Sequence, residues 1–379
     1  MKIAYLLTIG TPIGGAQIHV RDLSQWLSVN GHECHVLCGN PGAFEKQFEK
    51  QKVEFHAINS LERSILPLKD IKALTDVVRS LKKINPDILS IHSSKAGIVG
   101  RAAAHLVGIP CIFTAHGWAF AHGVSSSTRI LYGSIEKIAA MFAEKIITVS
   151  EHDRSLALRL KVAHKNRLIT IHNGMPDIPP ALLSAPAQEP VKIVMVARFQ
   201  KQKDFVTLFS ALSGLLGYKW SLNLIGDGPL LDLVQSQAEG FRITDRIIFW
   251  GEQDNVAEHL SKCQIFVLTS NWEGLPRSIL EAMRAGLPVI VSDVGGVSEA
   301  VVDEKTGFLI PRKDNKTLQN RLKILIADPE KRKKMGKAGR ESYEKNFTFN
   351  KMAEKTLQVY EEVLDSKSID IKAINFELN

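Results

Sequence analysis

The chain has 379 residues, of which 45% are hydrophobic and 23% charged, with a formal net charge of +8. This length suits two globular domains, each able to bury most of its apolar surface. No run of 18 apolar residues is present, and the apolar run in Met1–Gly10 is too short and too weakly flanked for a signal peptide, so we expect a cytoplasmic protein.

The positive charge is concentrated in the first half of the chain. Residues 1–187 hold 21 Lys and Arg against 14 Asp and Glu, whereas residues 188–379 hold 27 against 26. A basic first half is consistent with an anionic partner, such as a membrane surface or a phosphate-bearing lipid. Unselected variation in surface charge is the alternative. Nothing in the sequence predicts a nucleic-acid partner.

The four cysteines are predicted to be reduced and mostly buried, as in a reducing compartment. Cys34 and Cys38 lie in the run His32–Cys38, which could suggest a metal site. Their spacing has no second pair of ligands downstream, and the run is better explained as a strand. We therefore predict no metal there.

Short apolar runs alternate with amphipathic segments in the first half. Strands are predicted at residues 2–8, 32–38, 53–58, 87–92, 111–116, 145–150 and 168–172. Helices are predicted at residues 16–30, 68–84, 96–107 and 127–143, with another beginning at residue 151. Alternation of this kind predicts βαβ units around a parallel sheet.

A segment rich in proline and small residues, Asn173–Pro190, interrupts this pattern and is predicted to be a linker. The alternation then resumes, with strands predicted at residues 192–197, 221–225, 246–250, 264–268 and 288–293 and helices at residues 205–216 and 230–237. From Pro329 onward the chain is predicted to be helical. We therefore expect two doubly wound α/β domains, residues 1–187 and 188–351, with ligands at the carboxyl ends of their strands.

The stretch Phe266–Gly296 has the clearest functional pattern. A buried strand is followed by a turn, a short helix and a second strand, and the carboxylates of Glu273 and Glu281 lie eight positions apart. Pro276 suits the first helical position. The amides around it would then point out of the helix N-terminus, where an anion binds well. The alternative is that Glu281 only pairs with an arginine on the exposed face of the helix.

This stretch resembles the E-x7-E signature of the retaining glycosyltransferases of family 4, because Glu273-Gly-Leu-Pro and Glu281 are followed by Ala-Gly-Leu-Pro-Val-Ile. Matching features near both ends extend the resemblance over most of the chain. It implies the GT-B fold, in which two Rossmann-like domains face each other across a cleft. It also implies that a last helix, around residues 352–379, returns to pack on the first domain.

In the first domain, Gly14 and Gly15 follow the first predicted strand and precede a helix, so the backbone can approach a phosphate closely. The G-x-G-x-x-G pattern of a dinucleotide-binding fold is missing. The loop resembles the Gly-Gly loop of family 4, and His116 matches the family histidine that contacts the transferred sugar. A tight turn and a structural histidine are the alternatives. The aromatic loop 118–123 is predicted to contact the acceptor.

In the second domain, Arg198 ends the first strand and Lys203 precedes a helix capped by Asp204. The spacing resembles the diphosphate-binding cations of family 4, although Lys201 lies in the same loop and could serve instead. The turn Gly226–Pro229 is predicted to be scaffold. Asp254 lies in the loop where the family binds the base, and nothing there distinguishes uracil from guanine.

By this resemblance, the protein transfers a sugar from a nucleotide-diphosphate donor, favoured as a UDP-sugar, to an acceptor hydroxyl with retention of configuration. Glu273 would bind the sugar hydroxyls and Glu281 the ribose hydroxyls, while Arg198 and Lys203 would stabilise the leaving phosphate. The turn Gly274, Leu275, Pro276 and Arg277 would contact the substrate, with the backbone N–H groups of Leu275, Arg277 and Ser278 as donors. No isolated Asp-x-Asp motif is present, so neither a metal nor another cofactor is predicted.

The acceptor is predicted to be a lipid-linked saccharide used in cell-surface polysaccharide synthesis, at the inner face of the membrane. The basic residues that favour docking there include Arg79, Lys82 and Lys83 and the segment 154–167. The alternatives are a transferase with a small soluble acceptor and a nucleotide-sugar epimerase of the same fold. A nicotinamide-dependent oxidoreductase lacks its fingerprint here. A non-catalytic subunit would be expected to have lost Arg198, Lys203, Glu273 or Glu281.

Overall fold

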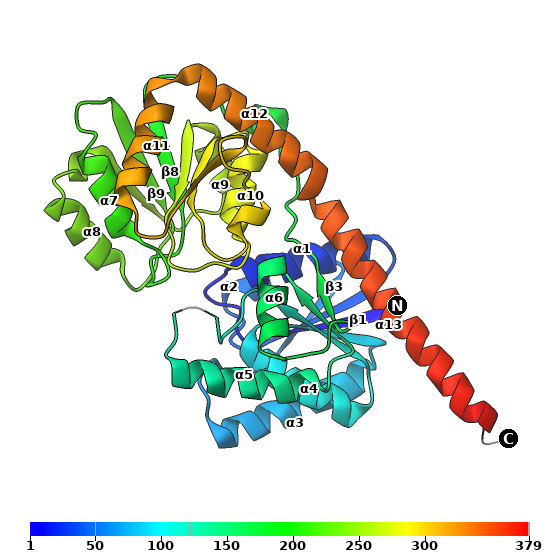
Figure 1. Ribbon diagram of the computed structural model, residues 1–379. Coiled ribbons are helices and arrows are strands. Elements are labelled where there is room, and N and C mark those ends of the chain that lie inside the picture. Colours follow the sequence, from blue (N-terminus) through cyan, green and yellow to red (C-terminus); the bar gives the residue numbers. More distant parts are fainter. Residues whose placement is uncertain (50, 122, 378–379) are drawn as a thin grey trace. The chain divides into compact units, whose positions relative to one another are not determined.

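The protein folds into two compact units in a computed structural model that describes residues 1–49, 51–121 and 123–377, with side chains described up to residue 367. Unit 1 comprises residues 1–171 and the C-terminal helix from Ala353 onward, and unit 2 comprises residues 172–352 (Figure 1). The expected linker therefore groups with unit 2. Met175 exchanges backbone hydrogen bonds with Phe347 and Phe349, which ties this segment to the end of the unit.

Unit 1 is built on a seven-stranded parallel sheet with the order β3-β2-β1-β4-β5-β6-β7. The strands are β1 (Lys2–Leu7), β2 (Glu33–Cys38), β3 (Val53–Ala57), β4 (Ile88–His92), β5 (Cys111–Ala115), β6 (Lys145–Thr148) and β7 (Leu168–Thr170). The helices are α1 (Gly15–Val29), α2 (Ala43–Lys46), α3 (Pro67–Ile84), α4 (Ser94–Val107), α5 (Ser126–Ala140), α6 (Glu151–Arg159) and the returning α13 (Phe349–Glu377).

The central strands of unit 1 are continuous apolar runs because helices cover both faces of the sheet. Residues 3–7 of β1 are all buried, as is the whole of β4. The helices carry one apolar stripe each. In α3, for example, the buried positions are Ala73, Val77, Leu81 and Ile84, spaced three or four residues apart.

The C-terminal helix α13 completes unit 1 as the resemblance implied. Tyr360 on this helix is fully buried, and its hydroxyl donates a hydrogen bond of 2.7 Å to the Oγ of Ser90 on β4. Buried Val359 and Val363 lie on the same helix. This distant segment is therefore part of the core of unit 1.

Unit 2 contains a six-stranded parallel sheet with the order β10-β9-β8-β11-β12-β13. The strands are β8 (Val191–Val196), β9 (Trp220–Ile225), β10 (Ile247–Gly251), β11 (Ile265–Leu268), β12 (Val289–Ser292) and β13 (Gly307–Ile310). The helices are α7 (Phe205–Ser213), α8 (Leu231–Gly240), α9 (Val256–Ser261), α10 (Arg277–Arg284), α11 (Asn315–Ala327) and α12 (Pro329–Asn346), with short 3₁₀ turns at Pro180–Leu182, Thr244–Arg246 and Val297–Glu299. The sequence analysis missed α2, α9, α11 and β13.

Each sheet has one point where the strand order changes direction. In unit 1 this point lies between β1 and β4, and in unit 2 it lies between β8 and β11. At this point the loops that follow the two neighbouring strands lead to opposite sides of the sheet and so move apart. The space at the carboxyl ends of these two strands is therefore the usual place for a ligand. Gly14 and Gly15 follow β1, Arg198 and Lys203 follow β8, and Glu273 follows β11.

All four cysteines are free and buried, as expected. Burial raises the pKa of each thiol to about 12, so they remain protonated at neutral pH. Among the described residues, none of the helices combines the length and apolar character needed to cross a bilayer.

Candidate active site

Lys203 and Glu273 form an ion pair at the switch point of unit 2. Their side chains are only 9% and 6% exposed, respectively. Glu273 also accepts a hydrogen bond of 2.6 Å from the Oγ of Ser270 and one of 2.9 Å from the Nε2 of Gln202. The structure thus brings together two predicted residues from different loops, and it adds Gln202 and Ser270, which the sequence analysis had not singled out.

The loops after β8 and β11 are held together by their backbones. The amide of Asn271 donates to the carbonyl of Gln202 at 2.7 Å, and the amide of Asp204 donates to the carbonyl of Thr269 at 3.0 Å. Asp204 also caps α7, because its Oδ1 accepts from the amide of Thr207 at 3.1 Å. Lys203 is therefore fixed between a helix cap and a neighbouring loop.

Two glycine turns support these loops from the adjacent strands. Gly295 has a φ of +62°, and a Cβ there would lie 1.9 Å from the carbonyl oxygen of Glu273. Gly226 has a φ of +127°, and a Cβ there would lie 2.1 Å from the carbonyl oxygen of Ala197. Only glycine satisfies both the dihedral angle and the close approach. The Gly226–Pro229 turn thus acts as scaffold for the loop that carries Arg198.

Arg198 lies on the same sheet edge but is exposed. Within the described residues its guanidinium makes no hydrogen bond or ion pair. Lys201 is also exposed, whereas Lys203 is committed to Glu273. Of the two candidate lysines, Lys203 is therefore the one built into the site.

Helix α10 begins one residue later than predicted. Pro276 is its N-cap, with φ −64° and ψ 127°, because this backbone is extended rather than helical. The first amides of the helix are consequently those of Arg277, Ser278 and Ile279, which point out of its N-terminus. Leu275 is buried, and its carbonyl accepts from the Nδ2 of Asn173 at 2.9 Å.

Glu281 is half-buried on α10, and no ion pair joins it to Arg277 or Arg284 in the part of the chain that the structure describes. Arg284 instead donates to the carbonyl of Pro176 at 2.7 Å. This argues against the alternative that Glu281 only pairs with an arginine on the surface of the helix. Gly274 lies beside the ion pair, with its carbonyl accepting from the amide of Gly296 at 2.9 Å.

Asp254 is exposed in the loop after β10, two strands away from β8. Nearby, the Trp250 ring contacts His259 edge-on at 4.7 Å, and its Nε1 donates to the Oδ1 of Asn223 at 2.9 Å. The described contacts therefore do not join Asp254 to the group around Glu273, and its predicted role near the base rests on the resemblance.

In unit 1, Gly14 is the N-cap of α1 and has an extended backbone. Its amide donates to the Oε1 of Gln17 at 3.1 Å, and the Nε2 of Gln17 donates to the carbonyl of Ile9 at 2.9 Å. Gln17 thus fixes the loop on which Gly14 and Gly15 lie. The first amides of the fifteen-residue α1 point out of its N-terminus.

His116 is held by a chain of hydrogen bonds that begins on α13. The Tyr360 hydroxyl donates to Ser90 Oγ, which lies 3.0 Å from the Nε2 of His92. The Nδ1 of His92 lies 3.0 Å from the Nε2 of His116. Because Ser90 accepts from Tyr360, its own proton is available to His92, whose Nδ1–H can then donate to His116. This order leaves the ring proton of neutral His116 on Nδ1.

The sequence analysis missed His92 and His19, which contact this ring. His19 on α1 meets His116 edge-on at 4.9 Å, and His92 stacks on His116 at 5.3 Å. His92 ends β4 just as His116 follows β5, and the two strands are neighbours. That shared position at the carboxyl ends of predicted strands was the available clue.

The prediction that the loop 118–123 presents aromatic side chains to an acceptor is wrong for its two large rings. Trp118 and Phe120 are buried and stack on each other at 4.9 Å. The Nε1 of Trp118 donates to the carbonyl of Asp153 at 2.9 Å. These rings are core residues. His122, in the same loop, lies outside the described residues.

We expect His92 to make the stability of unit 1 depend on pH. Burial, with a further contribution from His116, lowers the pKa of His92 well below its usual 6.5. The unfolded chain therefore takes up a proton that the folded protein does not, so stability is complete above about pH 6.5 and falls as the pH drops below it. Thermal unfolding between pH 7 and 5 should show a smaller loss of Tm for His92→Gln than for the wild type.

The exposed His164 gives the matched control, because His164→Gln should keep the pH dependence of the wild type. An equally steep dependence in His92→Gln would contradict the assignment to His92.

Comparisons with known proteins identify the family of the chain. The model of the glycosyl transferases group 1 matches residues 184–342, and that of Glycosyltransferase Family 4 matches residues 13–177. The chain is 27% identical to the UDP-Gal:alpha-D-GlcNAc-diphosphoundecaprenol alpha-1,3-galactosyltransferase of Escherichia coli, over 97% of this chain and 98% of that protein. It is 26% identical to the N-acetyl-alpha-D-glucosaminyl L-malate synthase of Bacillus anthracis, over 96% and 98%.

Among solved structures, HepE of Anabaena in complex with UDP and glucose superposes with a TM-score of 0.83 over 96% of this chain and 100% of that chain, at 20% identity. That likeness concerns the fold. The two family models together span both units, including the Gly14 loop, His116, Arg198, Lys203 and the two glutamates. The chain therefore belongs to the group 1 glycosyltransferases of family 4 and has the GT-B fold.

Proposed function

We propose that the protein transfers a sugar, with retention of configuration, from a UDP-sugar to a hydroxyl of a lipid-linked saccharide in cell-surface polysaccharide synthesis. The observation that carries this proposal is the group at the switch point of unit 2. There, an exposed arginine, a fixed lysine–glutamate pair and a helix N-terminus lie on one sheet edge. Cations and the amides of a helix N-terminus suit a diphosphate, and carboxylates suit hydroxyl groups.

The barrier to such a transfer is the departure of the nucleoside diphosphate, during which negative charge builds on its β-phosphate. Arg198 and Lys203 stabilise that charge, with the amides at the start of α10. Glu273 orients Lys203 and accepts hydrogen bonds from the sugar, while Glu281 binds the ribose. These donors act without a metal ion, so we propose a metal-independent reaction. The family resemblance also assigns His116 a contact with the transferred sugar.

Retention is carried over from the family resemblance and allows two routes. A double displacement needs a carboxylate nucleophile at the sugar. Glu273 is a poor choice, because its oxygens already accept from Lys203, Ser270 and Gln202. We therefore propose front-face attack, in which the departing phosphate takes up the proton of the acceptor hydroxyl.

The test of this function is a transfer assay in two stages. Thermal shifts with UDP, GDP, ADP and their common sugars identify the base, because ligands that bind only the folded state raise Tm. Incubation of the stabilising donor with an undecaprenyl-diphosphate-linked saccharide should then give one extended product whose anomeric configuration is that of the donor. An inverted linkage would exclude retention, and release of a free epimer would identify an epimerase.

Replacing Glu281 with Ala is expected mainly to raise the KM for the donor, by roughly ten-fold to a hundred-fold, with a much smaller change in kcat. The reason is that a ribose contact is made equally in the ground state and the transition state. Steady-state kinetics with varied donor measure both constants. An equal fall in kcat and kcat/KM would contradict this role.

The lipid-linked acceptor is favoured because one relative of nearly equal length is named for a diphosphoundecaprenol-linked substrate. Another relative of similar identity is named as a malate-based synthase, so a small soluble acceptor is the alternative. The surface of unit 1 supports the lipid-linked acceptor. Large apolar side chains are exposed on and near α3 and α5, namely Ile65, Leu66, Leu68, Ile71, Ile130, Leu131, Ile138, Met141 and Phe142.

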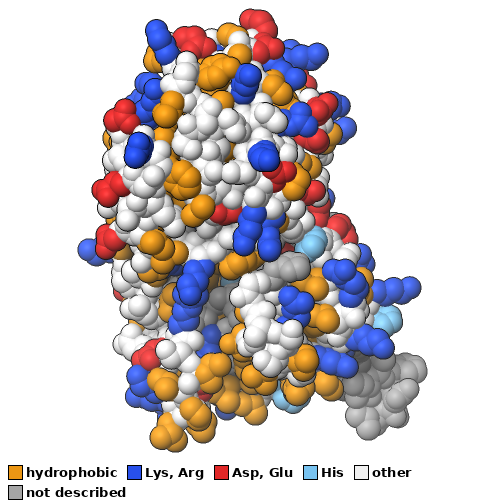
Figure 2. All heavy atoms as spheres, turned by 60° about the vertical axis from the view of Figure 1, so that its left-hand side comes forward, with side chains coloured by type: hydrophobic (Ala, Val, Ile, Leu, Met, Phe, Trp, Pro, Cys, Tyr) orange, Lys and Arg blue, Asp and Glu red, His pale blue; other side chains and the backbone are white. Residues whose placement is uncertain are grey.

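These side chains belong to one helical layer, because α3 packs on α4 and α4 packs on α5. Next to the end of α5 lies a surface hollow whose lining includes the cations Lys137, Lys161, Lys165 and Arg167. In Figure 2, hydrophobic and cationic side chains lie close together over the lower part of the view, where acidic ones are few. We propose that this surface docks on an anionic bilayer.

We expect the protein to sediment with vesicles that contain phosphatidylglycerol, and to be released as the ionic strength rises. The double variant Ile138→Gln, Met141→Gln should bind these vesicles less well, because it removes two apolar side chains that are 62% and 70% exposed. The control is Leu233→Gln, which removes a 52% exposed side chain from α8 in unit 2. No salt-sensitive sedimentation of the wild type, or an equal loss in the control, would overturn the docking surface.

A further inference from the structure

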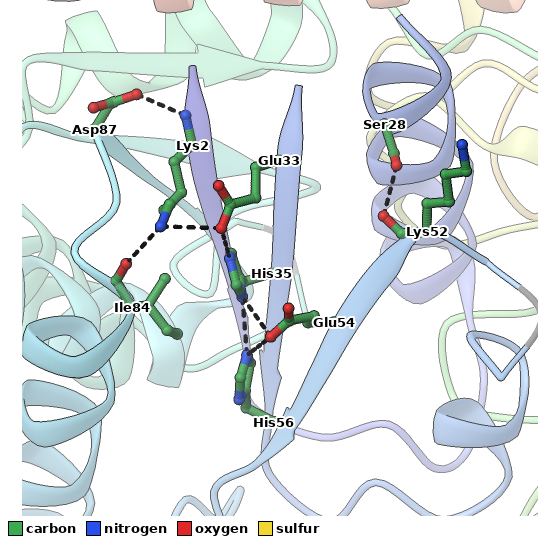
Figure 3. Close-up of polar contacts among 9 residues, drawn as sticks. All are labelled: Lys2, Ser28, Glu33, His35, Lys52, Glu54, His56, Ile84 and Asp87. Carbon is green, nitrogen blue, oxygen red and sulfur yellow. Dashed lines mark hydrogen bonds and ion pairs between the residues drawn. The ribbon is translucent and has the colours of Figure 1, made fainter. Parts of the chain in front are cut away.

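A second group of histidines and carboxylates lies away from the proposed reaction, at the edge of the sheet of unit 1. This group of side chains joins β2 to β3. Strand β3 lies at the edge of the sheet, where it pairs with β2. The register places His35 opposite Glu54 and Leu37 opposite His56, so Glu54 and His56 project from the same face of β3. Figure 3 shows these side chains converging beside Glu33.

The distances within this group fit one small ion. The Nδ1 of His35 lies 3.0 Å from the Nε2 of His56 and 3.5 Å from the Oε2 of Glu54. The Nε2 of His56 lies 3.9 Å from the same oxygen. The nearest point that is equidistant from the three atoms lies in their plane, about 2.0 Å from each of them, which matches Zn–N and Zn–O bond lengths.

The remaining contacts hold His35 in the orientation that a ligand needs. Its Nε2 lies 3.0 Å from the Oε1 of Glu33, which in turn pairs with Lys2 at 3.0 Å. A carboxylate on one ring nitrogen keeps the proton there and directs the lone pair of the other nitrogen at the metal. His35 is itself buried, with only 5% of its side chain exposed, so this orientation is fixed by its surroundings.

The open side of the group supplies access. The side chains of Glu54 and His56 are 71% and 29% exposed. The carboxylates of Glu33 and Glu54 offset the charge of a divalent ion.

We propose that His35, Glu54 and His56 form a binding site for a divalent transition metal such as Zn²⁺, with water as a fourth ligand and Glu33 as the positioning residue. Two imidazoles and one carboxylate suit zinc and its neighbours rather than Mg²⁺ or Ca²⁺. The metal links the edge strand β3 to β2 and so stabilises unit 1. It takes no part in sugar transfer.

The sequence spacing around Cys34 and Cys38 did not reveal this site, because only one ligand comes from that run. Side chains alternate along β2, so the two cysteines face away from His35. The other ligands follow on β3, and only the strand pairing brings them together. The cysteines remain outside the site, in agreement with their interpretation as buried thiols.

The test measures Zn²⁺ binding to the metal-free full-length protein by titration calorimetry, together with Tm in the presence and absence of Zn²⁺. We expect the wild type to bind one Zn²⁺ through this site and to gain Tm. Glu54→Gln and His56→Gln should each weaken that binding at least ten-fold and lose the gain in Tm. Both side chains are solvent-accessible, so these variants should fold, as their Tm without metal verifies.

Two further variants make the assignment specific. The control His164→Gln should bind and respond as the wild type does. The histidines His19, His92 and His116 also lie within reach of a common ion. If His116→Gln abolishes the binding and His56→Gln leaves it unchanged, or if no variant of Glu54 or His56 alters it, the proposed site is wrong.

Discussion

Replacing Lys203 with Met is expected to remove nearly all transfer and to destabilise unit 2, whereas adding Glu273→Gln should restore the stability but not the activity. The side chains of Lys203 and Glu273 are almost fully buried, and each is the other's counter-charge. Removing one partner of such a pair leaves an uncompensated charge, which costs about 3–5 kcal/mol. Neutralising Glu273 as well removes that cost.

The activity should not recover in the double variant, because in the proposed mechanism the lost ammonium is also a donor to the leaving phosphate. Loss of one preorganised donor of this kind lowers kcat by about 10²–10³. Thermal unfolding of unit 2 should show a Tm lower by roughly 10 °C for Lys203→Met, and a Tm close to that of the wild type for the double variant.

The two measurements separate the structural role of Lys203 from its role in transfer. If the double variant regained stability together with activity, Lys203 would be only a structural counter-charge. If the single variant kept its Tm, the ion pair would contribute little to folding. Ser270→Ala serves as a milder comparison, because it removes one neutral hydrogen bond to Glu273 and leaves the pair intact.

The architecture followed from the sequence because its periodicity is strong. Apolar runs flanked by amphipathic segments specify a parallel sheet covered by helices, and runs such as Ile3–Leu7 have no polar face to place in water. Shorter elements were missed where this contrast is weak. β13 has only four residues, and the glycine at its start gives no apolar run of the usual length.

Candidate site residues that lie close to one another along the chain were easier to predict than residues that only the fold brings together. Gly274 and Glu281 belong to one turn and helix, so their spacing carries information. By contrast, Gln202 reaches Glu273 only because two loops meet at the switch point between β8 and β11. Sequence spacing contains nothing that fixes this contact.

The hydrogen-bond chain to His116 was the contact least predictable from the sequence. Its members Tyr360, Ser90 and His92 come from a distant helix and a strand, and Tyr360 has the appearance of an ordinary core residue in the helical pattern. Tyrosine, serine and histidine occur in the cores of many folds, so their presence alone predicts no such chain. The chain of hydrogen bonds forms only when α13 returns to unit 1.

Replacing Arg198 with Ala is expected to lower kcat by about 10²–10³ while leaving Tm almost unchanged. Arg198 is exposed, and within the described residues it has no internal partner to lose, so the folded state should change by no more than about 0.5 kcal/mol. In the proposed mechanism its guanidinium acts on the charge that develops as the diphosphate leaves, so the effect should be on kcat more than on the KM for the donor.

Two matched variants sharpen this prediction. Arg198→Lys should recover only part of the activity, because an ammonium group cannot make the forked, two-bond contact that a guanidinium makes with a phosphate. Lys201→Ala removes an exposed cation from the same loop and should leave kcat within about two-fold of the wild type, because no transition-state contact is assigned to that residue and only an exposed side chain is lost. Equal losses in Arg198→Ala and Lys201→Ala would show that the loop acts through its total charge, and the specific role of Arg198 would then be wrong.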